Sequence, residues 1–331
     1  MNEIFALVCR SFGPPPILAL ETVEAPRAGP GEALVQVAYV ALNFFDTLIV
    51  QGKYQTKPQP PFSPGGEFSG RIVALGAGVE GLRLGERVFG SVAYGAARAI
   101  VAAPSTRLFA VPDGLSMERA AGLSIAYGTT LHAYRQRARL MPGETVVVLG
   151  ASGGVGLAAV EIGALLGALV IACASTPEKV ALALAHGASE GVDYSAQDLR
   201  EALRALSPKG VDVVYDPVGG AQTEIGLRAL KDGGRLLVVG FASGEVSRPP
   251  LNVALVKGAD VLGVEWGKFA GREPDANRDN LSRIAVWAAA GKLGTHIHGV
   301  HQLSDFANAF ADIAARRVQG KVLLRIGEGY S

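Results

Sequence analysis

The sequence has little cysteine and no excess of charge of either sign. Its two cysteines, Cys9 and Cys173, lie far apart in apolar stretches, so we expect buried free thiols, as is compatible with a reducing cytoplasmic compartment. The formal net charge is +1, and no block of basic residues offers a surface for nucleic acid. The first residues contain neither the basic nor the apolar segment of a secretory signal. We therefore predict a cytoplasmic protein with no nucleic-acid partner.

Charged residues are almost missing between positions 146 and 174, where Glu161 is the only one. A window this apolar resembles a membrane helix in its hydropathy. The β-branched run at its start, the glycines that follow it and a second β-rich run favour a strand, a helix and another strand instead. Parallel strands buried on both faces need such continuous apolar runs. We therefore predict no membrane span, and no amphipathic basic helix suggests a membrane partner.

The most informative stretch that is present covers residues 146–156, Val-Val-Val-Leu-Gly-Ala-Ser-Gly-Gly-Val-Gly. The aliphatic run predicts a strand, and the segment after the glycines predicts a helix. Glycines are required where any Cβ would keep the backbone away from a pyrophosphate. The helix N-terminus then offers free N–H groups and the positive end of its dipole to the phosphates. Ser152 departs from the G-x-G-x-x-G pattern, so this stretch alone is a weak signal.

The order of the predicted elements indicates a two-domain α/β protein. Residues 1–120 are β-rich, with short strand candidates between Pro/Gly turns, and residues 116–140 have a helical pattern. The strands predicted after them are 145–149, 168–173, 190–193, 211–215, 234–239 and 259–264, and the helices between them are 177–186, 197–206 and 220–231. This alternation predicts a parallel sheet with helices on both faces. The tail, 265–331, ends in a strand that we expect to pack on the N-terminal domain.

Motifs spread over nearly the whole chain resemble the medium-chain dehydrogenase/reductase superfamily. They lie at 30–32, 43–46, 64–70, 84–88, 126–129, 153–156, 214–219 and 320–324. Within the superfamily the chain resembles the zinc-independent, zeta-crystallin-like quinone oxidoreductases, whose loops are similar to the stretch around Ser152. Residues 263–268 are similar to the quinone oxidoreductase-like proteins. The resemblance implies a GroES-like β-rich catalytic domain, 1–122 and 265–331, and a Rossmann doubly wound NADP-binding domain, 123–264.

The zinc ligands of the superfamily are missing from this sequence. Asn43-Phe-Phe-Asp46 stands at the Cys-x-x-Asp position of the alcohol dehydrogenases, and Gly65-Gly66-Glu67 stands at their Gly-His-Glu position. Zinc needs thiolate, imidazole or carboxylate ligands, and two cysteines cannot form a four-cysteine lobe. Without a Lewis acid, alcohol oxidation loses the group that stabilises an alkoxide. A quinone or an α,β-unsaturated carbonyl needs less help, because it accepts hydride at carbon while charge delocalises onto oxygen.

A histidine cluster leaves one metal alternative open. His296, His298 and His301 lie close together in the tail. On a strand, His296 and His298 would share a face, so metal binding is conceivable there. The other interpretation is a partly exposed strand and loop in a part of the fold where the family holds no metal.

The residues after the second predicted strand indicate which nicotinamide cofactor binds. About twenty residues past the glycine loop, an NAD enzyme places Asp or Glu on the adenosine ribose. This sequence has Ser175 and Thr176 there, followed by Pro177, Glu178 and Lys179. Two hydroxyls and an ammonium suit a 2′-phosphate, and no carboxylate stands at the strand end to repel it. We predict NADPH, although Ser175 and Thr176 can also cap the helix that begins at Pro177.

The resemblance also implies residues that act on the substrate. Asn43 and Asp46 resemble the polar pair beside the nicotinamide, where Asn43 would bind a ribose hydroxyl or the carbonyl of the acceptor. Tyr54 resembles the tyrosine over the substrate pocket, whose hydroxyl would donate to the developing enolate or quinol oxygen. Asp46 and Tyr54 can alternatively be structural, as a buried carboxylate with its donors and as a packing aromatic. Many relatives carry a second tyrosine near Leu48, and its absence weakens the match to a quinone pocket.

The remaining implied positions bind the cofactor, and most of them follow predicted strands, whose ends line a nucleotide crevice. They are Thr129 at the nicotinamide end, Gly153, Gly154 and Val155 at the pyrophosphate, Ser175, Thr176 and Lys179 at the 2′-phosphate, Tyr194 near the adenosine, and Pro217, Val218, Gly240, Phe241 and Ser243 after the fourth and fifth strands. Lys321 would close over the cofactor, or it lies on a solvated strand edge.

We predict an NADPH-dependent, zinc-independent reductase that transfers hydride to a quinone or to the β-carbon of an α,β-unsaturated carbonyl. One alternative is an enoyl-thioester reductase of the acryloyl-CoA type, which needs a basic groove for a CoA phosphate. Arg135, Arg137 and Arg139 alternate in the sequence, but on a helix they do not share a face. A second alternative is a non-enzymatic NADPH-binding protein with a structural or regulatory task. The apolar segment 261–264 predicts a homodimer if it forms a sheet edge.

Overall fold

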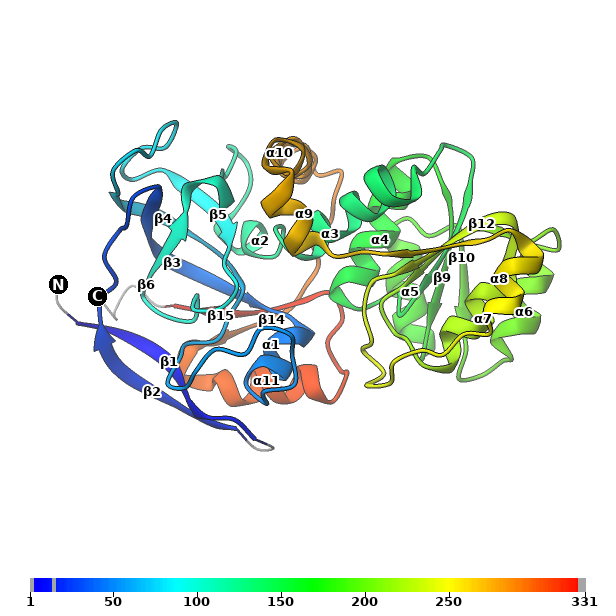
Figure 1. Cartoon of the computed structure of the whole chain (residues 1–331), viewed down its shortest axis with the longest axis horizontal. Helices are drawn as coiled ribbons and strands as arrows, with labels where there is room; N and C mark the ends of the chain where they lie inside the picture. Colours follow the sequence, from blue (N-terminus) through cyan, green and yellow to red (C-terminus); the bar gives the residue numbers. More distant parts are fainter. Residues whose placement is uncertain (1–2, 14–15, 327–331) are drawn as a thin grey trace. The chain divides into compact units, whose positions relative to one another are not determined.

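The computed structural model describes residues 3–13 and 16–326, and the chain folds into two compact units (Figure 1). The β-rich unit contains Met1–Ile125, Leu281–Gly291 and Thr295–Ser331. The parallel-sheet unit contains Ala126–Asn280 and Lys292–Gly294. These bounds differ from the predicted division at 122 and 265 chiefly because residues 265–280 belong to the parallel-sheet unit.

Aromatic packing attaches this segment to the parallel-sheet unit. Helix α9 (Trp266–Arg272) lies beside α3 (Ala126–His132), and the ring of Phe269 stacks on His132 with centroids 3.9 Å apart. The indole N–H of Trp266 donates to Oδ1 of Asn277 at 2.9 Å. Stacked and hydrogen-bonded aromatic side chains contribute strongly to packing, and such a contact cannot be recognised from the order of strands alone.

A six-stranded parallel sheet forms the centre of the parallel-sheet unit, in the order β10-β9-β8-β11-β12-β13. Its strands are β8 (Thr145–Leu149), β9 (Leu169–Ala174), β10 (Glu190–Asp193), β11 (Val211–Asp216), β12 (Leu230–Val238) and β13 (Asp260–Gly263). The helices that cover it include α4 (Gly154–Leu165), α5 (Pro177–Ala185), α6 (Leu199–Leu206), α7 (Ala221–Ala229) and α8 (Leu251–Lys257). Each of the six predicted strands is confirmed within a few residues, and so is the predicted Rossmann-type fold.

Burial on both faces explains the continuous apolar strands of this sheet. Val147 and Leu149 of β8 pack in one core with Leu203 of α6 and Leu227 of α7, and all four are almost fully buried. Their neighbour Val148 is also fully buried, although it points to the opposite face. Complete burial of a valine or leucine side chain contributes roughly 1.5–3 kcal/mol. A polar residue on either face would lose that contribution, so the alternation typical of half-exposed strands is absent here.

The β-rich unit is built on a seven-stranded sheet in the order β14-β15-β3-β4-β5-β7, with β6 paired to β3. Its strands are β3 (Glu32–Leu42), β4 (Glu67–Leu75), β5 (Arg87–Ser91), β6 (Ile100–Pro104), β7 (Leu108–Ala110), β14 (Ile297–Gln302) and β15 (Lys321–Arg325). Strand β15 runs antiparallel to β3, with Val322 opposite Leu42. The predicted return of the tail to the N-terminal domain is therefore confirmed.

Several elements of the chain were not predicted as such. They are the strand β1 (Glu3–Ser11), most of its hairpin partner β2 (Ile17–Glu24), the strands β6 and β7, and the helices α1 (Phe44–Ile49), α10 (Pro274–Ala289) and α11 (Phe306–Ala314). Helix α2 (Met117–Ala121) lies within the predicted helical pattern 116–140. Helix α1 has only six residues, too few for a helical period to be recognised. Its start carries Asn43 and Asp46, two of the predicted site residues.

The two thiols are free and buried, as predicted. Burial raises the pKa of the Cys173 thiol to about 12, so it stays protonated at neutral pH. Among the described residues, no helix combines the length and the hydropathy that crossing a membrane requires. The apolar window 146–174 is instead divided between β8, α4 and β9, as predicted.

Candidate active site

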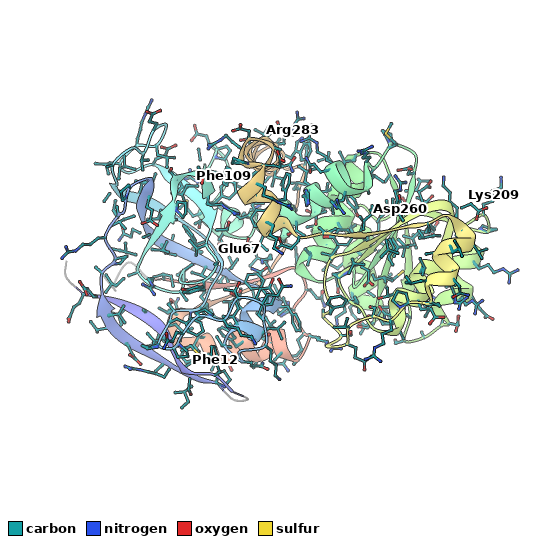
Figure 2. The ribbon with its side chains drawn as sticks, in the orientation of Figure 1. Phe12, Glu67, Phe109, Lys209, Asp260 and Arg283 are labelled. Atoms are coloured by element: carbon teal, nitrogen blue, oxygen red, sulfur yellow. The ribbon has the colours of Figure 1, made fainter. Side chains whose placement is uncertain are left out.

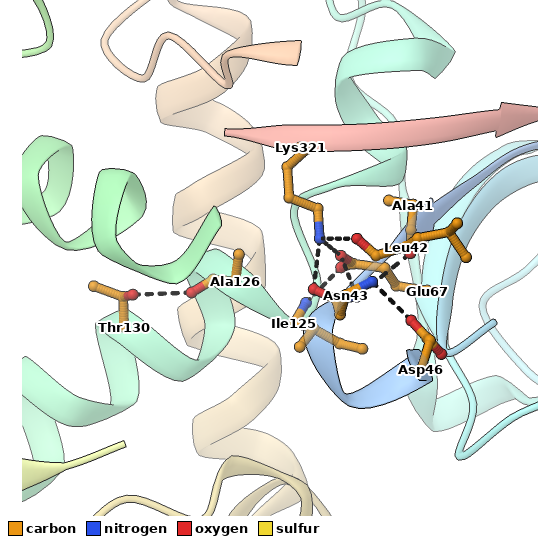
Figure 3. A network of polar contacts seen from close by, with 9 residues as sticks. All are labelled: Ala41, Leu42, Asn43, Asp46, Glu67, Ile125, Ala126, Thr130 and Lys321. Carbon is orange, nitrogen blue, oxygen red and sulfur yellow. Dashed lines mark hydrogen bonds and ion pairs between the residues drawn. The ribbon is translucent and has the colours of Figure 1, made fainter. Parts of the chain in front are cut away.

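A cluster of buried polar side chains lies in the β-rich unit, where β3 ends and α1 begins (Figure 3). Asn43 is the N-cap residue of α1 and has an extended backbone, with φ −122° and ψ 164°. Oδ2 of Asp46, three residues later, accepts the backbone N–H of Asn43 at 2.7 Å. This contact is one half of a capping box, which satisfies a helix N–H that would otherwise lack an acceptor. The predicted pair is therefore joined through the start of one short helix.

Lys321 and Glu67 form a buried ion pair at the centre of this cluster (Figure 3). The Lys321 ammonium lies 2.5 Å from Oε1 of Glu67 and 2.6 Å from Oδ1 of Asn43, and it also donates to the carbonyl oxygen of Leu42 at 3.4 Å. Lys321 and Glu67 are the first residues of β15 and β4, the two strands that flank β3. Strand pairing therefore brings together residues that are 254 positions apart in the sequence.

The surroundings of Lys321 show that it does not lie on a solvated strand edge, and they add Glu67 to the candidate site. Lys321 is only 4% exposed, and β15 lies inside the sheet, so the solvated strand edge is wrong. Glu67, labelled in Figure 2, is fully buried and was not among the predicted site residues. Its other oxygen, Oε2, accepts the backbone N–H of Ile125 at 2.7 Å. Its place in Gly65-Gly66-Glu67, the position of the Gly-His-Glu motif, was the signal that could have identified it.

These residues do not fit a zinc ion. Zinc requires anionic or neutral lone-pair donors, whereas the group held by Glu67 and Asn43 is itself a cation. A side chain at position 66 would also lack room, because a Cβ there would lie 2.7 Å from Cζ of Phe45. The aromatic ring of Phe45 therefore fills the space next to Gly66, and we derive no step through a metal.

The histidine cluster of the tail is not arranged like a set of metal ligands. His296 precedes β14, and His298 is exposed on that strand. Nδ1 of His301 lies 2.9 Å from Oδ2 of Asp305. In the described part of the chain, no three His, Cys, Asp or Glu side chains gather where they could hold a metal ion.

Asp46 is fully buried, and this environment perturbs its ionisation. Burial is the largest cause, and it raises the pKa of Asp46 from an ordinary value of 3.8 to about 7. The backbone N–H groups of Asn43 and Gly65 and the charge of Lys321 oppose this rise, while the charge of Glu67 adds to it. Among the described residues, Oδ1 of Asp46 has no hydrogen-bond partner. Asp46 therefore holds a proton up to about neutral pH.

This raised pKa predicts how stability depends on pH. The unfolded chain ionises Asp46 near its ordinary pKa, whereas the folded chain retains the proton until about pH 7. The contribution of Asp46 to stability is therefore fully present below about pH 4 and is lost as the pH rises through 7. Between about pH 5 and pH 8, we expect the free energy of unfolding of the wild-type protein to fall by roughly 3 kcal/mol more than that of Asp46→Asn. Urea unfolding of both proteins at the two pH values measures this, and parallel pH dependences would show that Asp46 ionises normally.

Tyr54 lies on the loop after α1 and stacks on Phe45, with ring centroids 5.4 Å apart and an interplanar angle of 27°. Both rings pack against a buried apolar group that includes Ile49 and Phe62. The packing interpretation of Tyr54 therefore has direct support. Its role as a hydrogen-bond donor to a substrate remains a prediction.

In the parallel-sheet unit, the glycine turn between β8 and α4 is closed by its own backbone. The N–H of Gly153, the N-cap of α4, donates to the carbonyl oxygen of Gly150 at 3.1 Å. A Cβ on Gly156 would lie 2.1 Å from that same oxygen, so only glycine fits there. The turn thereby leaves Gly154 and Val155 in the first turn of α4, where N–H groups are available to an anion.

The residues predicted for a 2′-phosphate come together at the end of β9. Thr176 is the N-cap of α5, and its Oγ1 accepts the backbone N–H of Lys179 at 3.3 Å. The Lys179 ammonium donates to Oγ of Ser175 at 3.2 Å. Tyr194 follows the neighbouring strand β10, and its N–H donates to the carbonyl oxygen of Ala174. Thr176 therefore caps α5 while Lys179 lies beside Ser175, so the same segment has both a helix cap and a cation.

The loops after β11 and β12 are joined by backbone hydrogen bonds. The N–H of Ser243 donates to Val218 at 2.8 Å, and that of Ala242 donates to Pro217 at 3.0 Å. Gly240 and Phe241 belong to the second of these loops. The buried Asp216 shapes the first loop, because its carboxylate accepts the N–H groups of Val218 and Gly219 and the hydroxyl of Thr223. Asp216 was not among the predicted site residues.

Thr130, rather than its neighbour Thr129, makes the polar contacts at the end of α3. Its hydroxyl lies 3.0 Å from the hydroxyl of Tyr215 on β11 and donates to Ala126 at 2.9 Å (Figure 3). Thr129 is partly exposed. A role of Thr129 at the nicotinamide end of a cofactor stays a prediction.

Comparison with known families defines the class of the protein. Residues 29–113 match the family model of the alcohol dehydrogenase GroES-like domain, and residues 154–282 match that of the zinc-binding dehydrogenases. With the two folds described above, these matches define an oxidoreductase of the medium-chain dehydrogenase/reductase superfamily that binds a nicotinamide cofactor. The alternative of a non-enzymatic protein is therefore set aside.

Individual relatives narrow this class. The chain is 35% identical over 323 residues to quinone oxidoreductase-like protein 2 of Rattus norvegicus, which covers 97% of this chain and 92% of the relative. The chain therefore belongs to the quinone oxidoreductase-like family. A quinone oxidoreductase of Pseudomonas syringae pv. Tomato DC3000 has a similar structure, with a TM-score of 0.89, 31% identity, and coverage of 97% of this chain and 99% of that one. A mycobacterial protein complexed with NADPH has a TM-score of 0.89, 28% identity and the same coverage.

Proposed function

We propose that this protein is an NADPH-dependent reductase that delivers a hydride to a quinone or to the β-carbon of an α,β-unsaturated carbonyl compound, without a metal. NADPH, when bound, supplies the hydride from C4 of its nicotinamide. The protein binds and orients both reactants and excludes water, while charge that develops on the acceptor oxygen is neutralised by a proton from Tyr54 or water. The observation that supports chemistry without a metal is the buried ammonium of Lys321, which lies between Asn43 and Glu67. A metal ion at this place would need lone-pair donors, and an ammonium is not one.

The choice of NADPH over NADH rests on the end of β9. Ser175 and Lys179 form a hydroxyl–ammonium pair there, and no carboxylate follows the strand at 175 or 176. A dianionic 2′-phosphate is attracted to such a pair, whereas the ribose hydroxyls of NADH gain little from it. The relative whose structure contains NADPH supports the same cofactor for this chain.

Replacement of Lys179 by alanine tests this choice. We expect the Kd for NADPH to rise roughly 10- to 100-fold, because a charge-assisted hydrogen bond contributes about 1.5–3 kcal/mol. The Kd for NADH should stay the same. Titration of cofactor fluorescence measures both constants, and Lys209→Ala, an exposed lysine on another surface (Figure 2), is the matched control. An unchanged NADPH affinity in Lys179→Ala would overturn the assignment.

Two arginine contacts favour a small acceptor over a CoA thioester. Arg135 is held by Asp279 and Asn280, each at 2.7 Å, and Nε of Arg137 donates to the carbonyl oxygen of Gly263 at 2.9 Å. These two guanidinium groups therefore already have partners within the parallel-sheet unit. For Arg135 and Arg137 to bind the phosphates of CoA, these contacts would have to break. We propose a small hydrophobic carbonyl compound or quinone as the substrate.

A homodimer is proposed from the edge of the parallel sheet. Strand β13, which begins at Asp260 (Figure 2), is the last strand in the sheet order. Val261 on this strand and Leu255 and Val256 on α8 are apolar side chains exposed by 41%, 82% and 83%. An open edge flanked by exposed apolar side chains is a surface that proteins usually cover. A second copy of the chain, paired edge to edge, would cover it.

Charge placed on this edge should separate the dimer. We expect Val261→Lys combined with Leu255→Lys to sediment as a monomer at micromolar concentration, because burial of charges of the same sign, which cannot pair with one another, costs several kcal/mol. The control is Val286→Lys, which changes an exposed valine of the β-rich unit. A wild-type protein that sediments as a monomer under the same conditions would remove the proposal.

A further inference from the structure

The Lys321–Glu67 pair is difficult to explain as a source of stability. Both side chains are almost completely removed from water, with side-chain exposures of 5% and 0%. Desolvation of two such charges costs several kcal/mol, and replacement of a buried ion pair by uncharged residues of similar volume is often neutral or stabilising. The pair therefore needs a reason other than stability. Its contacts with Asn43 provide one.

The two charges determine which end of the Asn43 amide points in which direction. The oxygen and nitrogen of an asparagine amide are nearly equal in size, so packing alone does not distinguish them. An ammonium can only donate and a carboxylate can only accept, so Oδ1 of Asn43 must face Lys321 at 2.6 Å and Nδ2 must face Glu67 at 3.1 Å. The amide orientation is therefore fixed by opposite charges on its two sides (Figure 3).

This orientation also limits what Asn43 can offer to a ligand. Nδ2 carries two hydrogens, and these are used by Oε1 of Glu67 and, at 3.4 Å, by the carbonyl oxygen of Ala41. Oδ1 accepts one hydrogen bond from Lys321, and an amide oxygen has two lone pairs. Asn43 is partly exposed, whereas both charged residues are buried. The group that remains for a ligand is one lone pair of Oδ1.

We propose that Lys321 and Glu67 are positioning residues that make Asn43 an acceptor only. Asn43 then binds a hydroxyl group, such as a ribose hydroxyl of the cofactor, and it does not donate to the carbonyl oxygen of the hydride acceptor. Of the two ligands that the sequence left open for Asn43, this proposal selects the ribose hydroxyl over the carbonyl of the acceptor. Tyr54 or water remains as the donor to the acceptor oxygen. The inference rests on the proposed reductase function and specifies the task of one part of its site.

A double-mutant cycle tests this coupling. Lys321→Met alone would leave a buried carboxylate without its cation and could unfold the unit, so both charges are removed together in K321M/E67Q. Asn43→Ala is then made in the wild-type protein and in K321M/E67Q. NADPH Kd, kcat and KM are measured for all four proteins, with thermal unfolding as the check of folding. The matched control replaces the pair Arg235–Glu144 of the parallel-sheet unit, which is joined at 2.5 Å, in R235M/E144Q.

We expect Asn43→Ala to raise the NADPH Kd or lower kcat by roughly 10- to 100-fold in the wild-type background. In the K321M/E67Q background the same change should cost less than about 3-fold, because the amide orientation is already lost. K321R should retain most of the activity. Equal effects of Asn43→Ala in both backgrounds, or full activity of K321M/E67Q, would overturn the inference. A wild-type protein that binds NADPH but reduces no acceptor would instead overturn the proposed function, and the cycle in NADPH Kd would still test the coupling.

Discussion

Replacement of Gly156 by alanine is expected to abolish cofactor binding. The added Cβ would lie 2.1 Å from the carbonyl oxygen of Gly150 and 2.9 Å from its carbonyl carbon. These are backbone atoms that cannot rotate away, so the turn between β8 and α4 must open. The N–H groups at the start of α4 then lose the arrangement that holds a pyrophosphate. We expect the NADPH Kd to rise more than roughly 100-fold and the apo protein to lose about 1–3 kcal/mol of stability.

Gly153→Ala is the matched control for this prediction. A Cβ on Gly153 would have its nearest neighbour, the same carbonyl oxygen, at 3.6 Å, which is ordinary van der Waals contact. The apo protein should therefore keep its stability, while the methyl group would lie where the predicted pyrophosphate approaches. Calorimetry of the apo proteins and NADPH titration separate the two effects. If Gly156→Ala binds NADPH as the wild type does, the turn is not the phosphate site.

The second large effect is expected at Glu161, the one charged residue of the apolar stretch 146–174. Its carboxylate is buried in α4 and accepts hydrogen bonds from the hydroxyl of Tyr127 at 2.8 Å and the N–H of Gly294 at 2.9 Å. It also lies 2.5 Å from Nδ1 of His186. Three groups from separate segments, the buried Tyr127, the partly buried His186 and the backbone of Gly294, therefore contact one buried carboxylate, and together they hold the helix that follows the glycine turn.

Glu161→Ala should lower the free energy of unfolding by about 3–5 kcal/mol, because it removes this acceptor and leaves a cavity. Glu161→Gln keeps the volume and part of the hydrogen bonding, so we expect a smaller loss, roughly 1–3 kcal/mol. Urea unfolding of the three proteins gives these differences. A loss below about 1 kcal/mol for Glu161→Ala would contradict the view that this contact organises the unit.

The parallel-sheet unit could be predicted from the sequence because its physical requirements are local. A strand buried on both faces must be apolar throughout, and β8, with only its first residue Thr145 polar, begins and ends at 145 and 149 as predicted. The turn after β8 needs glycine for close approach, and the residues after β9 need a cap and a cation. Each requirement leaves a signal within a few residues. Ser175, Thr176 and Lys179 are close together in the structure because they are close together in the sequence.

The charged centre of the candidate site could not be predicted in the same way. Lys321 meets Glu67 only because β15 pairs with β3 from the far end of the chain. No periodicity in either segment encodes that pairing, so Lys321 could be interpreted as a solvated edge residue. The segment 265–280 was assigned to the other domain for a similar reason, since the stacking of Phe269 on His132 is a long-range contact. Local propensity does not contain such information.

The central claim, hydride transfer from NADPH without a metal, is tested most directly by isotope transfer. The purified protein is incubated with NADPH deuterated at C4 and an α,β-unsaturated ketone, in the presence of a chelator. We predict that NADPH is consumed in equal amount to the product, that the label is found at the β-carbon, and that only one of the two C4 epimers transfers it. The account would be contradicted if NADPH binds but is not consumed with quinones, enones or enoyl-CoA esters. It would also be contradicted if the chelator abolishes turnover.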